Sequence, residues 1–461
     1  MAVSQQAGAP APALRGSRVF GSMTQLRTDY LGTILRAARE LGSVARIDAG
    51  PPGWRFTFYS ISTPDLVPEI LGQPDRYTKD VAVYHELRWS LGNGLLSSEG
   101  AEWLRQRRLL APIFTHRRIT TAYAAIMVEE ARRLVARWRA PAAAGDHLDV
   151  HAEMIGLTSR IIGRILFGAD MATAVPPIMR FKFVNEALLM RALNPHPTPV
   201  WVPTPANRRL RAGLTEIRRV VDDVIASRRA GRPAEQSEDM LALLLAANQA
   251  GEAGSAADGE IADQVLIFLL AGHDTTASTL ACALIELARS ADWQQAVRDE
   301  VDQLLGGRAA TAADAENLPW TGRVVREAMR LYPAAHSINR SPAQDEMLDG
   351  YRIPAKSSVT ISPWTVHRAP EVWRDPETFD PRRFDVPPGQ FPGGHKYAWF
   401  PFGAGRRACI GSQLALLEVT LVLATILQAY RVETSVQTVP LVAAVTLHPA
   451  VPLPVRLVPR G

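Results

Sequence analysis

The sequence predicts a mainly α-helical protein with minor β-sheets, and two features of the pattern support this prediction. Helical periodicity dominates from Glu102 to about Arg289 and resumes over Ser412–Tyr430. The β-rich runs are short, and those within Val432–Leu457 are separated by prolines. No repeat of fixed period and no low-complexity linker divides the 461 residues. We therefore expect one domain over residues 1–461, with any disorder limited to about the first 15 residues.

The individual elements follow from local patterns. Tyr30–Leu41 has the spacing of an amphipathic helix, and Val44–Asp48 and Phe56–Ile61 are β-rich runs joined by a Gly-Pro-Pro-Gly turn. Two loops should interrupt the helical region. Asn194–Pro205 carries five prolines and cannot be helical. Ala246–Gly259 is rich in glycine, alanine and polar residues, which favours a loop between two helices.

Composition argues against several classes of function. The chain is 47% hydrophobic and 21% charged, as in a globular protein with a large core. Its net charge of +5 is mild, and its 47 Arg and 4 Lys are scattered, which disfavours nucleic-acid binding. The N-terminus lacks a signal-peptide pattern, and the longest apolar runs, Val265–Gly272 and Val419–Leu427, are shorter than the roughly 20 residues that span a bilayer. We expect a soluble, cytoplasmic protein that does not enter a membrane.

The chain has two cysteines, and they lie in different contexts. Cys282 belongs to an apolar helical run, which is typical of a small buried side chain. Cys409 lies in the segment 402–411, F-G-A-G-R-R-A-C-I-G, where three glycines let the backbone approach a flat, bulky group closely. The two arginines and the following helix N-terminus favour a thiolate. An idle cysteine in a glycine-rich turn, or a redox-active one without a resolving partner, would be the alternatives.

This segment resembles the haem-binding loop of the cytochrome P-450 family, F-G-x-G-x-R-x-C-x-G, at every defined position. The resemblance implies the cytochrome P-450 fold, with haem b between a long oxygen-activation helix and the helix after the Cys loop. It makes Cys409 the axial ligand of the iron and Arg407 a partner of a haem propionate, and it places Phe402 and Gly411 against the cofactor. An electron-rich thiolate ligand favours O–O cleavage. The implied activity is that of a haem-thiolate monooxygenase.

A second segment contains Glu327 and Arg330, three residues apart and hence on one face of a helix. Taken alone, such a pair is usually a solvated surface pair. In the family, however, this E-x-x-R motif joins an arginine about fifty residues further on. The resemblance therefore implies a buried network of Glu327, Arg330 and Arg383 that holds the haem-side core. Arg382 stands where Glu is commoner, at a position outside that network.

The third segment, 271–276, reads A-G-H-D-T-T within a helix from about Ile261 to Arg289. A polar cluster in an apolar helix is costly unless it is hydrogen-bonded. Glycine and threonine together favour a local widening of the helix, although a satisfied polar kink would also fit. The cluster resembles the oxygen-activation groove of the family. By that resemblance Asp274 and Thr275 are the catalytic acid and alcohol, and His273 is a packing residue.

Trp103 and Arg107 lie one helical turn apart, usually no more than a helix face. In the family a W-x-x-x-R at this place hydrogen-bonds a haem propionate, and Arg340 would be a further propionate partner.

The resemblance also places a substrate pocket on the distal side of the haem. Its walls should come from Val81–Leu96, Arg180–Leu193, Ile267–Ala271, Ala334–Ile338 and the tail near Val445. The residues that we expect in this pocket are Val83, Leu189, Ile267, Ala271, Ala335 and Val445. Most of these are apolar, so a hydrophobic substrate is expected.

The proline-rich loop Asn194–Pro205 would belong to a mobile entrance lid. The overlapping stretch Pro203–Arg209 looks similar to segments of bacterial terpene-oxidising family members. Terpenoids, fatty acids, polyketides and macrolides all remain open as substrates.

No flavin or ferredoxin module follows Cys409, so electrons should come from a separate ferredoxin or flavodoxin with its reductase. Arginines near the loop could dock such an acidic partner. We expect a monomer that uses O₂. One alternative is a peroxide-using or isomerising relative, which usually lacks the acid and alcohol; another is a haem-based sensor or carrier.

Overall fold

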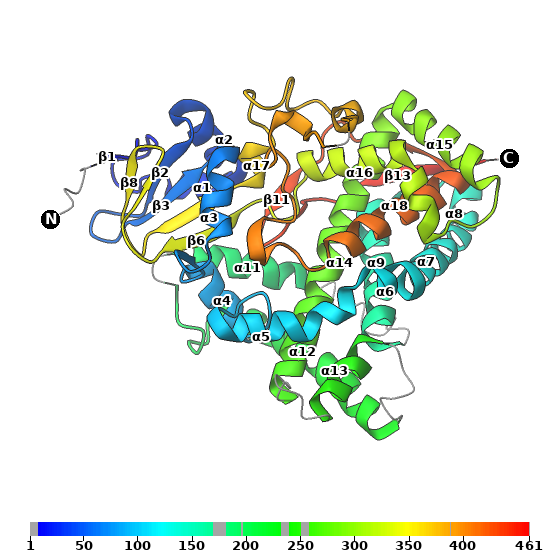
Figure 1. Cartoon of the computed structure of the whole chain (residues 1–461), viewed down its shortest axis with the longest axis horizontal. Coiled ribbons are helices and arrows are strands. Elements are labelled where there is room, and N and C mark those ends of the chain that lie inside the picture. Colours follow the sequence, from blue (N-terminus) through cyan, green and yellow to red (C-terminus); the bar gives the residue numbers. More distant parts are fainter. Residues whose placement is uncertain are drawn as a thin grey trace.

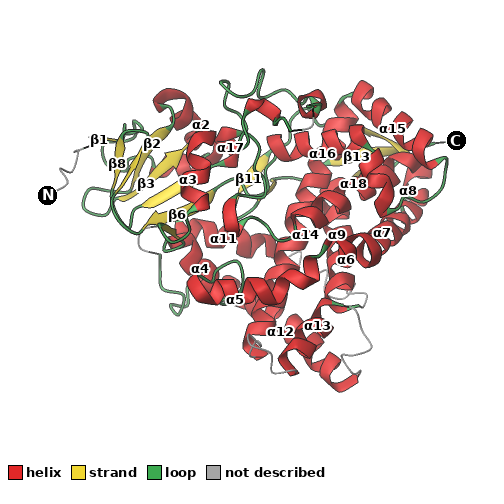
Figure 2. Ribbon diagram, in the orientation of Figure 1, coloured by secondary structure: helices red, strands yellow, loops and turns green. Residues whose placement is uncertain are grey.

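Helices form most of the protein, and the largest β-sheet lies at the end that holds the N-terminus (Figures 1 and 2). The structure is a computed structural model that describes residues 8–168, 181–194, 197–231, 239–249, 258–387 and 389–460. Its longer helices are α2 (Tyr30–Leu41), α4 (Ala82–Leu91), α5 (Gly100–Leu110), α7 (Ala124–Arg137), α9 (Val150–Phe167), α11 (Phe181–Ala192), α12 (Pro205–Gly231), α13 (Met240–Gln249), α14 (Asp258–Arg289), α15 (Ala291–Leu305), α16 (Pro319–Leu331) and α18 (Ser412–Ala429). The expected mainly α-helical fold with minor β-sheets is confirmed.

The main sheet has five strands in the order β2-β3-β9-β6-β4. Only the pairing of β3 with β9 is parallel. The strands are β2 (Val44–Ala49), β3 (Phe56–Ile61), β9 (Ser358–Ile361), β6 (Ile338–Pro342) and β4 (Tyr77–Thr78). Because β6 and β9 come from the second half of the chain, the sheet joins the N-terminal region to residues far along the sequence.

Three small sheets complete the β-structure of the described residues. They are β1-β8-β7, β10-β13-β5 and the antiparallel pair β11-β12. Their strands are β1 (Ala9–Pro10), β5 (His147–Asp149), β7 (Glu346–Leu348), β8 (Tyr351–Ile353), β10 (Tyr430–Thr434), β11 (Leu441–Ala443), β12 (Leu447–Pro449) and β13 (Pro454–Pro459). Near the start of the described residues, β1 pairs with β8, and Leu14 N donates to Arg46 O at 2.8 Å.

The central helix α14 packs along α9 and also contacts α12, α16 and α18. It is α-helical throughout, so the widening expected around Gly272 is not seen. Packing explains this glycine instead, because a Cβ added there would lie 2.9 Å from Ile162 Cδ1 on α9. The hydroxyl of Thr158, also on α9, donates to His273 O at 2.9 Å. Gly272 thus allows α14 and α9 to approach closely, and the hydrogen bond from Thr158 to His273 O holds them together.

By length and composition, α14 and α18 could each cross a membrane, although the apolar runs looked shorter in the sequence. Of the most apolar 18-residue window in each helix, 78% and 61% respectively is buried inside the protein. Such burial is typical of core helices.

Most predicted boundaries are close to those observed. The helix Tyr30–Leu41 is confirmed, and residues 197–204 are non-helical, with α12 beginning at Pro205. The predicted loop Ala246–Gly259 is wrong at its start, because α13 continues to Gln249. Leu244 and Leu245 of this helix are buried, and their packing against the core stabilises the helix beyond the point where the local sequence predicts a loop. Residues 250–257 lie outside the described part of the chain.

Candidate functional site

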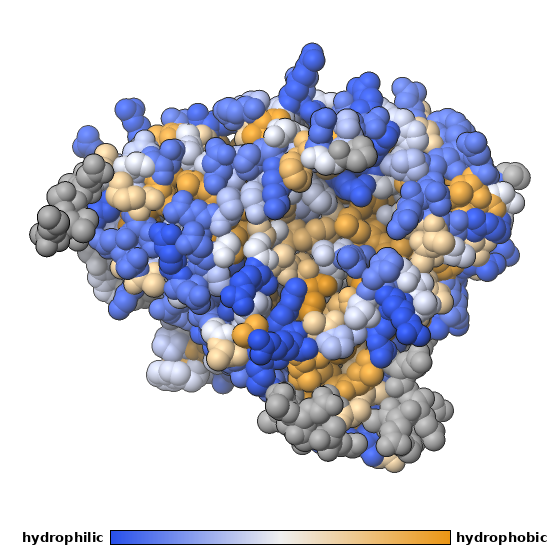
Figure 3. Space-filling model, viewed as in Figure 1, coloured by the Kyte–Doolittle hydropathy of each residue, from blue (hydrophilic) through white to orange (hydrophobic). Residues whose placement is uncertain are grey.

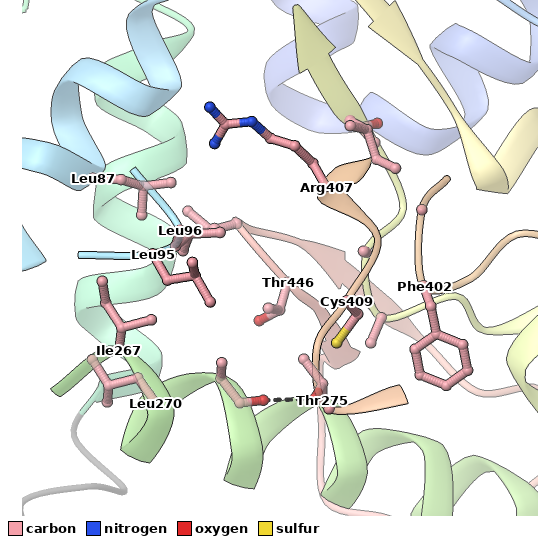
Figure 4. A pocket seen from close by; sticks show the side chains of 18 of the residues that line it. Leu87, Leu95, Leu96, Ile267, Leu270, Thr275, Phe402, Arg407, Cys409 and Thr446 are labelled. Carbon is pink, nitrogen blue, oxygen red and sulfur yellow. Dashed lines mark hydrogen bonds between the residues drawn. The ribbon is translucent and has the colours of Figure 1, made fainter. Parts of the chain in front are cut away.

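A cavity of about 460 Å³ lies beside α14 (Figure 4). Its walls come from the N-terminal sheet, α4, α9, α11, α14, β6, the Cys loop and the turn between β11 and β12. Most of the residues that line the cavity are apolar. In the space-filling view, hydrophobic residues lie in a hollow near the centre of the face that Figure 3 shows. The residues expected in a substrate pocket all line it: Val83, Leu189, Ile267, Ala271, Ala335 and Val445. Residue 180, at one end of an expected wall, lies outside the described residues.

Some walls were not anticipated from the sequence. The N-terminal region, α9 and α13 contribute Tyr30, Phe56, Phe58, Ile162, Leu166 and Met240. No local motif could have indicated these residues, because only the tertiary fold brings them to the cavity.

The Cys loop turns tightly through two glycines with positive φ, 71° at Gly403 and 69° at Gly405. A Cβ at Gly405 would lie 2.3 Å from Leu71 O, so only glycine fits there. The backbone N–H of Cys409 donates to Phe402 O at 2.9 Å and closes the loop. As a result the Cys409 side chain lines the cavity, with α18 starting at Ser412 (Figure 4).

The Cys409 thiol is open to the cavity but lies deep in the protein. This desolvation raises the pKa of Cys409, while a hydrogen bond from the Gly411 N–H and the charge of Arg107 act to lower it. Arg107 also donates to Ala408 O at 3.2 Å. The predicted W-x-x-x-R arginine therefore lies next to the loop that carries the thiol. Phe402 packs edge-to-face against Trp399, with ring centroids 6.2 Å apart.

A group of three cations lines the same cavity: Lys79, Arg340 and Arg407. Lys79 and Arg340 are each 5% exposed. Burial, and to a smaller extent the charge of Arg340, lower the pKa of Arg407 to about 10. Burial likewise lowers the pKa of Lys79, and both arginines add to that effect. Such a group is suited to bind an anion, because an anion would compensate the mutual repulsion.

Aromatic rings support these cations. The guanidinium of Arg407 lies over the ring of Trp103 and donates to Ser98 O at 2.7 Å. Arg340 donates to the Tyr84 hydroxyl at 3.3 Å. Lys79 was missed by sequence analysis. The only signal was its rarity, since it is one of four lysines in the chain.

The predicted acid and alcohol have different surroundings. Thr275 lines the cavity, and its hydroxyl donates to Ala271 O at 2.7 Å (Figure 4). Asp274 is 8% exposed, and its Oδ2 accepts hydrogen bonds from the Thr446 hydroxyl and, at 3.3 Å, from Asn185 Nδ2. Thr446 and Asn185 both line the cavity. His273 is buried and hydrogen-bonds Leu269 O at 2.9 Å within the helix, as a packing residue would.

The structure brings Glu327, Arg330 and Arg383 together. Glu327 and Arg330 are fully buried and form a two-point ion pair at 2.6 and 2.8 Å. Arg383 Nε lies 3.3 Å from Glu327 Oε1. Arg330 also donates to the carbonyls of His367 at 2.8 Å and Pro376 at 2.7 Å, which ties α16 to the segment before the Cys loop. The unusual Arg382 points away from the network and pairs with Asp380 at 2.8 Å.

The stretch Pro203–Arg209 has a structural role in this chain. Asn207 is 4% exposed and donates to Pro199 O and Val202 O, both at 2.9 Å. Its Oδ1 accepts from Arg191 at 3.3 Å, and Arg191 pairs with Glu86 of α4 at 2.7 Å. These contacts fasten residues 197–207 to α11 and, through Arg191, to α4.

The residues present fit a haem: a thiol opens into a deep, largely apolar cavity, and buried cations are available for carboxylates. A family model described as cytochrome P-450 matches residues 11–450, so the chain belongs to the cytochrome P-450 family. It is a haem b monooxygenase, which requires O₂ and a redox partner.

The chain is similar to three Streptomyces proteins over most of their length. It is 37% identical to cyclooctatin synthase of Streptomyces melanosporofaciens, over 80% of this chain and 79% of the relative. It is 34% identical to cyclooctat-9-en-7-ol 5-monooxygenase of the same organism, over 85% and 82% respectively. Pentalenene oxygenase of Streptomyces avermitilis is 31% identical, over 88% of each chain.

Proposed function

We propose that this cytochrome P-450 inserts one atom of O₂ into a terpenoid, by hydroxylation or epoxidation. The observation that carries the proposal is one cavity in which the Cys409 thiol and the Thr275 hydroxyl lie under mostly aliphatic walls. Walls of this kind select substrates by shape and apolar contact, with few polar groups to orient them. The relatives named for cyclooctat-9-en-7-ol and pentalenene support this class over fatty acids and macrolides.

Cys409 would bind the haem iron through Sγ, and the bound haem would supply the activation of O₂. Trp103, Arg107, Arg340 and Arg407 would hold its propionates, together with Lys79, and Arg107 would also steady the loop and the thiolate charge. Phe402 and Gly411 would pack against the haem on the Cys409 side. The Glu327–Arg330–Arg383 network would keep the Cys loop in place, because it anchors the chain segment that leads into it.

Proton supply would fall to Asp274 and Thr275. The Thr275 hydroxyl lies on the cavity wall, where it would hold the water molecule that donates a proton to the reacting oxygen. Asp274, the preceding residue, would relay protons from outside the cavity towards Thr275, as a general acid within hydrogen-bond reach can do. Electrons would come from a separate ferredoxin or flavodoxin and its reductase. The exposed Arg406 in the Cys loop offers a positive contact for such an acidic protein.

The proposal is tested by optical titration of the haem-loaded protein with panels of cyclic terpenoids, fatty acids and macrolides. The hits are then incubated with reduced ferredoxin or flavodoxin and O₂, and the products are analysed by mass spectrometry. A terpenoid that binds at micromolar concentration and gains one oxygen atom is expected. Oxygenation confined to fatty acids or macrolides would contradict the substrate class.

The same assay separates the two alternatives. Full turnover with hydrogen peroxide and no electron donor would indicate a peroxide-using enzyme. Tight binding of ligands without any product, even with reduced ferredoxin, would indicate a sensor or carrier.

A further inference from the structure

Three side chains from distant segments form a closed set of hydrogen bonds at the back of the cavity wall. Asp274 belongs to α14, Asn185 to α11, and Thr446 to the turn between β11 and β12. The Thr446 hydroxyl donates to Asp274 Oδ2 and accepts from Asn185 Nδ2. Asn185 Nδ2 also donates to Asp274 Oδ2 at 3.3 Å, and Asn185 Oδ1 accepts from the Thr446 N–H at 3.3 Å.

The directions of these bonds are mutually consistent. A threonine hydroxyl has one hydrogen to donate, and here it goes to the carboxylate. The two amide hydrogens of Asn185 go to the hydroxyl and the carboxylate, and its carbonyl takes the one backbone N–H. Asn185 is 1% exposed and Asp274 is 8% exposed, so water competes little for these groups. Hydrogen bonds that are shielded from water in this way are stronger than those at the protein surface.

We propose that Asn185 and Thr446 are positioning residues that hold the carboxylate of Asp274 in the orientation needed for proton supply. This inference rests on the proposed role of Asp274. Both hydrogen bonds end on Oδ2 and therefore fix the carboxylate plane relative to α14. The orientation exists only while α11 and the β11–β12 turn lie against α14.

The same two elements carry part of the cavity wall. Leu188 and Leu189 of α11 and Val445 of the turn line the cavity beside Asn185 and Thr446. Figure 4 shows Thr446 in the cavity that Cys409 and Thr275 also line. An apolar substrate that packs against these residues therefore helps to hold the elements that orient the acid.

The test compares Thr446→Val and Asn185→Leu, which keep side-chain size but remove the hydrogen bonds, with the parent enzyme. Each change should lower turnover about tenfold, part of what a placed acid contributes. Substrate KM should be unchanged or lower, because the cavity becomes more apolar. Thr446→Ser keeps the hydroxyl and should restore most of the turnover. Thr434→Val, which removes a tail hydroxyl bonded to Pro454 O, is the matched control and should leave turnover unchanged.

A second readout does not depend on activity. In the haem-loaded protein, hydrogen–deuterium exchange of residues 441–449 should speed up in Thr446→Val and Asn185→Leu but not in Thr446→Ser. Unchanged exchange in both variants would overturn the claim that these bonds hold the turn against α14.

Double variants separate this inference from the role of Asp274 itself. If Thr446 acts through Asp274, Thr446→Val should add no further loss to Asp274→Asn. Additive losses, or parent-like turnover in Thr446→Val while Asp274→Asn is slow, would overturn the positioning role alone. Parent-like turnover in Asp274→Asn would instead overturn the proposed role of Asp274, and this inference with it.

Discussion

The guanidinium carbon of Arg407 lies 4.4 Å from the ring centroid of Trp103, so the Cys loop rests on α5 through a cation and an aromatic ring. Contacts of this kind contribute about 0.5–2 kcal/mol. Trp103→Leu should therefore release haem faster than the parent, whereas Trp103→Phe should retain more of it. Haem transfer to an apo-globin acceptor measures the rate. Trp89→Leu, at a tryptophan that is 48% exposed, serves as the control, and equal rates in all variants would exclude this role of Trp103.

Cys409→Ala should abolish the long-wavelength Soret band of the reduced, CO-bound protein, and activity with it. The reason is that a thiolate ligand alone gives this band, and Cys409 is the cysteine whose side chain lines the cavity. The other cysteine supplies the control. Cys282 is buried in the core, where desolvation raises its thiol pKa, so Cys282→Ala should keep both the band and the activity. A band that persists in Cys409→Ala would refute the ligand assignment.

Glu327→Ala should destabilise the protein by about 3–5 kcal/mol, because it leaves Arg330 buried without its carboxylate. Little haem-loaded protein is expected from expression of this variant. Arg382→Ala removes a neighbouring pair whose arginine is 66% exposed, and it should change stability by less than about 1 kcal/mol. Urea unfolding and haem content measure both effects. Similar stabilities of the two variants would mean that the buried network does not hold the core.

Thr275→Ala should uncouple electron use from oxygenation. Haem content, the CO spectrum and substrate affinity should stay close to those of the parent, since the hydroxyl bonds only Ala271 O within the described residues. Product per reducing equivalent should fall by about tenfold, with hydrogen peroxide formed instead, because protons then arrive without the positioning that the hydroxyl provides. Thr275→Ser should recover much of the coupling. The check is to measure reducing-equivalent consumption, peroxide and product in one reaction; unchanged coupling would rule out the assignment.

Glu418 of α18 provides a pH-dependent test. It is 4% exposed, and burial raises its pKa to about 8 from 4.5. Between these pH values the folded protein keeps a proton that the unfolded chain loses, so this residue makes the free energy of unfolding fall as pH rises, by at most about 1.4 kcal/mol per pH unit. Glu418→Gln removes the effect.

The stability of Glu418→Gln relative to the parent should therefore increase from about pH 5 to pH 8, as measured by urea unfolding at each pH. Glu371→Gln, at an exposed glutamate, is the control for the substitution itself. A stability difference for Glu418→Gln that stays constant with pH would mean that its carboxyl is not perturbed by folding.

The sequence located the functional residues that belong to motifs of neighbouring residues. The loop around Cys409, the pair Glu327 and Arg330, and the helix with Asp274 and Thr275 could all be located because each motif is local. Asn185 and Thr446 could not be found in this way. They lie 89 and 172 residues from Asp274, and a single asparagine or threonine carries no pattern of its own. Lys79 was missed for the same reason.

The widened helix predicted around Gly272 was wrong for the opposite reason, because a local pattern was present but had a different physical cause. The local pattern at Gly272 suggested a widened helix, but a glycine has more than one physical use. Here it allows a neighbouring helix to approach, and that neighbour, α9, lies more than a hundred residues earlier in the chain.

The contact between Gly272 and Ile162 also limits how far the face of α14 that carries Thr275 can shift. Thr275 lies one turn further along the same helix, so any displacement of the helix at residue 272 moves the hydroxyl across the cavity. A single methyl group at 272 would have to displace either Ile162 or the helix itself. The position of Thr275 in the cavity thus depends in part on the size of residue 162, which itself lines the same cavity. Changes in the size of residue 162 should therefore alter regioselectivity in two ways, directly through the cavity wall and indirectly through the position of α14.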